Sequence, residues 1–180
     1  MSILSLLSRV QENINPKPHP FLDGESQEKE AYLAAVVLQA LADQRFCERE
    51  ERHYYKLADA FEVERERAKK VLARASEANE ALVVEICSAL RDTKYAYYLI
   101  VDLQIMAHVD NHLDEREAKV IHTFAGLLGI DEHDELFLVE LANAVALRDE
   151  TAKAGWVARF FDRLQKRGGM HPDAFDHYTH

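Results

Sequence analysis

Apolar residues after position 20 are spaced as they are on the buried face of an α-helix. They recur at steps of three and four, as at Leu33, Val36 and Val37, and no stretch alternates as a half-buried β-strand would. Because 48% of the 180 residues are apolar, the chain can bury one core. The pattern predicts an all-α bundle of about eight or nine helices. The expected helices are the segment before residue 15, those containing Leu33 and Leu57, and residues 65–75, 80–91, 94–109, 115–128, 132–146 and 150–167.

The two ends of the chain differ from its middle. Residues 1–20 combine a short amphipathic helix with a linker in which Pro16, Pro18 and Pro20 forbid helical structure. Residues 147–180 contain a basic amphipathic helix, with Trp156 on its apolar face, and a loose tail. We expect these end segments to pack on the core or on a partner, with peripheral membrane contact as an alternative. The central domain is predicted to span residues 21–146.

Charge and composition exclude several classes of function. The formal net charge of −10 repels phosphate backbones, so nucleic-acid binding is not expected. No apolar stretch approaches the roughly 20 residues of a transmembrane helix, and the first ten residues lack the features of a secretion signal. Cys47 and Cys87 are far apart and fit neither a disulfide framework nor a zinc finger. We therefore expect a cytoplasmic protein.

The sequence contains an internal repeat with an offset of 67 residues. The segment from Asp43 to Glu50 aligns with the segment from Asp110 to Glu117, and an acidic residue stands at both ends of each copy. The repeated units cover about residues 30–75 and 97–142. Each copy is predicted to form a helix, a turn and a second helix, with the glutamate in the opening turn of the second helix.

These residues resemble the repeated signature of the TerB family of tellurite-resistance proteins. The signature is a helix that ends in Ala-Asp-Gly, followed by a polar residue, an apolar residue and a Glu. It stands here as Ala42–Phe46 with Glu50, and as Val109–Leu113 with Glu117; the second copy continues through Phe124–Asp131. The same arrangement is similar to the TerB-like region of membrane-anchored DnaJ-type co-chaperones. The resemblance covers about residues 30–146 and implies a helical fold with two similar halves.

The turns depart from the signature at its glycine, which is replaced by Gln44 in the first copy and Asn111 in the second. Asn tolerates left-handed backbone better than Gln, so the first turn is the more altered of the two.

The resemblance implies that the turns are acidic sites for a divalent cation or a basic partner. Carboxylates suit hard cations, and a histidine in the second turn could add a transition-metal ligand. The competing interpretation is that the acids cap helices, since Asp114 and Glu117 form a variant of the capping box. An EF-hand is excluded because Ile121 occupies the position of its bidentate glutamate. The candidate metal ligands are Asp43, Glu50, Asp110, His112, Asp114 and Glu117.

No catalytic residue is predicted, because the chain has neither a Gly-x-Ser-x-Gly elbow nor a glycine-rich phosphate loop. Three hypotheses follow. The first is a non-enzymatic TerB-like module of the response to tellurite or metal-ion stress, presenting acidic turns to a divalent cation or a partner protein. The second is a metal-dependent enzyme that adds His53 to the carboxylate and histidine ligands. The third is a co-chaperone-like interaction domain. No other cofactor is expected, and the oligomeric state is left open.

Overall fold

The computed structural model describes residues 24–42, 46–91, 93–107, 115–146 and 159. These residues form helices and no strand, so the predicted all-α class is confirmed. The predicted helix at residues 1–14 and the proline linker lie outside the described residues, as does the predicted helix at residues 150–167 except for residue 159. The seven helices described are α2 (Ser26–Ala40), α3 (Glu48–Ala60), α4 (Arg65–Ser76), α5 (Glu80–Leu90), α6 (Lys94–Ala107), α7 (Glu115–Leu127) and α8 (Glu132–Ala146).

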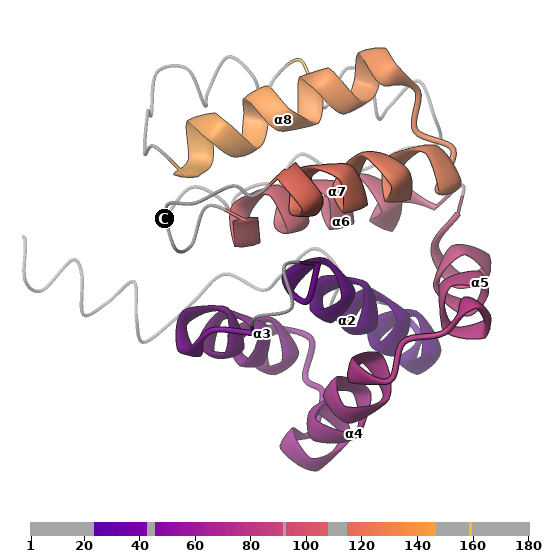
Figure 1. Cartoon of the computed structure of the whole chain (residues 1–180), viewed down its shortest axis with the longest axis vertical. Coiled ribbons are helices and arrows are strands. Elements are labelled where there is room, and N and C mark those ends of the chain that lie inside the picture. Colours follow the sequence, from indigo (N-terminus) through magenta and orange to yellow (C-terminus); the bar gives the residue numbers. More distant parts are fainter. Residues whose placement is uncertain (1–23, 43–45, 92, 108–114, 147–158, 160–180) are drawn as a thin grey trace, which may run out of the picture.

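The helices repeat with the same offset as the sequence. Adding 67 to both bounds of α3 gives the bounds of α7, and α4 and α8 likewise begin 67 residues apart. The packing repeats too: α2 packs most extensively on α4, and α6 does so on α8 (Figure 1). The two halves are therefore α2–α4 and α6–α8. Helix α5 joins them and packs on α2.

The centre of the bundle is the contact between α2 and α6. Every residue of Ala31–Val37 and of Tyr95–Gln104 is buried, since both stretches are nearly free of charge and can be covered on all sides. One buried charged residue lies in this interface: the Tyr32 hydroxyl donates to Asp102 Oδ2 at 2.5 Å. A buried polar group of this kind requires a partner, so the hydrogen bond sets how α2 and α6 meet.

The ends of α3 and α7 form the same turn. The Val63 amide donates to the Ala58 carbonyl and the Ile130 amide to the Ala125 carbonyl, each at 2.9 Å. This bond, which spans five residues, is the signature of a Schellman motif and satisfies carbonyls that a helix end leaves unpaired.

Other predicted local features are present. Asp131 caps α8, because its Oδ1 accepts the Asp134 amide at 2.9 Å. Asp134 is itself buried and accepts the Tyr97 hydroxyl at 3.1 Å. Phe46 packs against the core and meets the Tyr54 ring edge to face. No helix among the described residues is long and apolar enough to span a bilayer.

Candidate functional site

Glu50 is the third residue of α3 and is buried, with 7% of its surface exposed. Its Oε2 accepts the Cys47 amide at 2.7 Å, and the Glu50 amide in turn donates to Cys47 Sγ at 3.5 Å. This is a capping box in which a thiol replaces the usual hydroxyl. One carboxylate oxygen of Glu50 is thus committed to the start of its own helix.

Glu117 occupies the equivalent position in α7 and is also buried, at 5% exposed. Its described contact is with another helix: the Gln39 side-chain Nε2 donates to Glu117 Oε1 at 3.1 Å. Gln39 lies one residue before the end of α2 and is fully buried. The hydrogen bond therefore joins α2, which precedes the first acidic turn, to α7, which follows the second acidic turn.

This contact uses only the Nε2 atom of the Gln39 side-chain amide. Its side-chain Oε1 is buried and has no hydrogen-bond partner among the residues that the structure describes. An orphaned buried acceptor costs about 1–3 kcal/mol, and each such group in a folded protein calls for an explanation. An amide oxygen beside a carboxylate is also a pair of ligands of the kind that hard cations take.

The other four predicted ligands, Asp43, Asp110, His112 and Asp114, lie outside the described residues. Within the residues that the structure describes, no group of three His, Cys, Asp or Glu side chains is placed to hold a metal ion. Glu50 and Glu117 each lie at the start of their helix, as predicted. Glu50 accepts a hydrogen bond from the Cys47 amide, and Glu117 accepts one from the Gln39 side chain.

Sequence reasoning missed Gln39, which shares the buried site with Glu117. The signal was present: Gln39 is a lone amide in the apolar run from Ala31 to Leu41. Such a polar residue on a buried face must find a partner, which makes it a candidate site residue.

Comparison with known protein families decides the family of this chain. The family model for tellurite resistance protein TerB matches residues 29–137. The chain belongs to the TerB family. The match begins inside α2 and ends inside α8, so it covers α3 to α7 in full and the segments of both acidic turns. Comparison with curated proteins and with solved structures gave no significant match.

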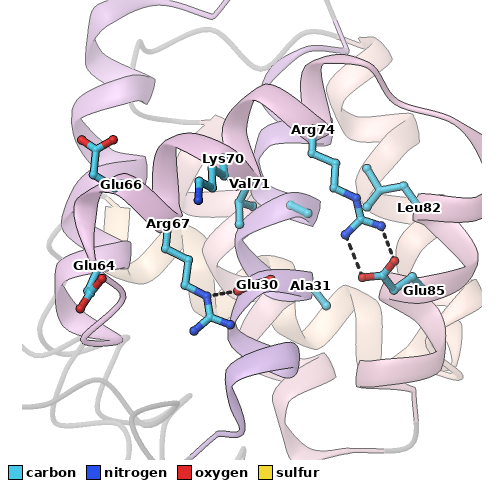
Figure 2. A pocket seen from close by; sticks show the side chains of 11 residues that line it. Glu30, Ala31, Glu64, Glu66, Arg67, Lys70, Val71, Arg74, Leu82 and Glu85 are labelled. Carbon is cyan, nitrogen blue, oxygen red and sulfur yellow. Dashed lines mark hydrogen bonds and ion pairs between the residues drawn. The ribbon is translucent and has the colours of Figure 1, made fainter.

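The TerB region also contains a hollow of about 410 Å³ between α2, α4 and α5. Ion pairs line it: Arg67 reaches Glu30, and Arg74 Nη1 lies 3.0 Å from Glu85 Oε1. Figure 2 shows Lys70 and Val71 between these two arginines. The hydrogen bond from Arg74 is the main reason that the pKa of Glu85 is lowered.

At three positions that line this hollow, the first half of the TerB repeat has a small or charged residue where the second half has a large apolar or aromatic one. The positions of Ala31, Lys70 and Arg74 correspond to Tyr98, Phe137 and Leu141, which are buried. The acidic side chains on its walls outnumber the basic ones. The hollow therefore gives an anion no net positive charge, and its ion pairs connect α4 to α2 and to α5. The acidic side chains are Glu30, Glu64, Glu66 and Glu85, and the basic ones are Arg67, Lys70 and Arg74.

Proposed function

We propose that this TerB-family chain is a non-enzymatic module of the response to tellurite or metal-ion stress. In this proposal it binds a divalent cation at the second acidic turn, beside Gln39 and Glu117. The observation that carries the proposal is the unsatisfied Oε1 of the buried Gln39, next to the Glu117 carboxylate that Gln39 itself holds. A cation there would supply the electrostatic partner that this oxygen lacks.

The chemistry of the neighbouring residues supports a hard cation. Amide and carboxylate oxygens are the usual ligands of Ca²⁺, Mg²⁺ and Mn²⁺. The sequence between α6 and α7 offers Asp110, His112 and Asp114 as further ligands. A buried site also strengthens the attraction between a cation and a carboxylate, because water screens it less.

The second turn is a better candidate than the first. In the first half, Glu50 Oε2 already accepts the Cys47 amide, and Cys47 stands where the second half has Asp114. The first half therefore offers two acidic residues, Asp43 and Glu50, where the second half offers three, Asp110, Asp114 and Glu117. The described residues add no observation that favours a metal-dependent enzyme or a co-chaperone-like domain. Presentation of the acidic turn to a partner protein is the alternative if no cation binds.

Thermal unfolding of the intact chain tests the proposal. The measurement compares Ca²⁺, Mg²⁺, Mn²⁺ and Zn²⁺ with a chelator. A cation that binds only the folded state at about 100 times its Kd adds roughly 2.7 kcal/mol of stability, which raises the Tm.

The decisive variant is Asp110→Asn with Glu117→Gln. If these acids bind a cation, neutralising them relieves repulsion in the apo protein. Its stability then holds or rises while the metal-induced shift disappears. If they are only caps, stability falls by about 0.5–2 kcal/mol with or without metal. The matched control, Asp43→Asn with Glu50→Gln, should keep the shift. A wild-type chain that shows no shift with any of the four ions refutes cation binding.

A further inference from the structure

A second hollow lies between the end of α2, the middle of α5 and the length of α7, on the outside of the bundle. Its volume is about 430 Å³. Its surface is mainly apolar and comes from all three helices, and we call it the α7 groove. Its principal residues are Leu38 of α2, Val83 of α5, and Lys119, Val120, Phe124 and Leu127 of α7.

The α7 groove leaves apolar surface in contact with water. Leu127 is 42% exposed, and Leu38, Val83 and Val120 are only partly buried. A contiguous apolar depression that joins three helices differs from the single exposed apolar residues that every protein has. Burial of this surface by a partner would be favourable.

The internal repeat shows that the fold does not require this surface. Helix α3 is the counterpart of α7, and it has His53, Lys56 and Ala60 at the positions of Val120, Thr123 and Leu127. The first half is thus built on the same helix arrangement without an apolar outer face. The apolar residues of α7 are a departure from the repeat, which points to a role outside the bundle.

The charge beside the groove indicates what kind of partner fits. Arg116 and Lys119 line it and are exposed, in a chain with a net charge of −10. They lie in the first two turns of α7, where the helix dipole is positive. Of the acids in that first turn, Glu117 is buried against Gln39, whereas Glu115 is exposed. An acidic group on the partner would meet complementary charge at this end of the groove.

We propose that the α7 groove binds an amphipathic helix of a partner protein. Apolar side chains at steps of three and four enter the groove, and an acidic side chain lies beside Lys119. A helix is the suitable shape because an apolar groove between helices accepts the apolar face of an amphipathic helix. Strand addition needs a free sheet edge, and the described part of the chain has no strand. This proposal is independent of cation binding at Gln39 and Glu117.

The test uses three designed helical peptides that share one leucine stripe and differ only in the flanking residue, which is Glu, Gln or Lys. Binding to the intact chain is measured by fluorescence anisotropy, with chelator present to exclude any cation effect. We expect the Glu peptide to bind about ten-fold more tightly than the Lys peptide. We also expect the methyl NMR signals of Val83, Val120 and Leu127 to shift when it binds.

Two pairs of variants locate the site. Leu127→Glu should abolish binding, whereas Leu136→Glu should not, because Leu136 is 61% exposed on α8 and does not line the groove. Lys119→Glu should reverse the preference for the Glu peptide over the Lys peptide. Its repeat counterpart Arg52→Glu, on the exposed surface of α3, should leave the preference unchanged. All four positions are exposed, so folding is expected to survive, and circular dichroism checks this.

Three results would overturn the proposal. The first is that none of the peptides binds. The second is that binding persists in Leu127→Glu with the same affinity. The third is that sedimentation shows the wild-type chain to form a dimer that Leu127→Glu dissociates, because the groove would then be an interface between two copies.

Discussion

Glu62 and Gly129 occupy the same position in the two halves, and both have left-handed backbone, with φ of 55° and 79°. They are 67 residues apart, and each follows the C-cap of its helix in a Schellman turn. Gly adopts this conformation without steric cost, whereas a residue with a Cβ pays roughly 1–2 kcal/mol. The first half therefore carries backbone strain that the second half avoids.

Replacing Glu62 by Gly should stabilise the protein. We expect a gain of about 0.5–1 kcal/mol in the free energy of unfolding, because the relief of strain exceeds the entropy that Gly adds to the unfolded chain. Urea unfolding measures it, and Gly129→Ala should lower stability by a similar or larger amount. Equal stability of Glu62→Gly and Glu62→Ala would contradict the assignment of strain to the left-handed backbone.

Removal of the Glu50 side chain should weaken the start of α3. In Glu50→Ala the Cys47 amide loses its acceptor, and we expect a loss of about 0.5–2 kcal/mol. The control is Glu51→Ala, which removes the same charge from the same turn at an exposed position. Chemical denaturation compares the two, and an equal effect of both would show that charge at the helix start matters and the capping box does not.

The hydrogen bond between Tyr32 and Asp102 should couple α2 to α6. Each of Tyr32→Phe and Asp102→Ala should cost at least about 1–3 kcal/mol, because a polar group in the buried interface loses a partner. The double variant should cost less than the sum of the two, since both variants remove the same bond. A double-mutant cycle by urea unfolding gives the coupling energy, and strict additivity would argue against this contact.

Stability should fall in alkaline solution. Burial is the main cause that raises the pKa of Tyr54 and of Tyr98 above the ordinary value of 10.0. Because the folded state holds these protons to higher pH, the unfolded state ionises first. Their contribution is therefore complete below pH 10.0 and is lost as the pH rises above it.

Unfolding midpoints between about pH 8 and pH 11 measure this loss, together with the ultraviolet absorbance of tyrosinate. In Tyr54→Phe the stability should fall less steeply as the pH rises. Stability at neutral pH should also be lower, because the Ala68 carbonyl loses the Tyr54 hydroxyl, which lies 2.7 Å away. Ionisation of all seven tyrosines before any loss of helical signal would contradict the prediction.

The positions of the helices could be predicted because the signals for them are local. The predicted segment 132–146 matches α8, and 115–128 and 65–75 differ from α7 and α4 by one residue. Caps such as Asp131 act over three residues, and the repeat is visible as an offset in the chain itself. The family followed from the same local patterns, since its signature consists of turns and helix starts.

The pairing of buried polar groups was decided by the tertiary structure. Gln39 meets Glu117 across 78 residues of chain, and Tyr32 meets Asp102 across 70. A lone polar residue in an apolar run tells us that a partner is needed, but the partner's identity depends on how the two halves pack. The α7 groove has the same origin. Its residues come from helices that are far apart in sequence, and they form one surface only because α2, α5 and α7 come together; no other described helix lines it.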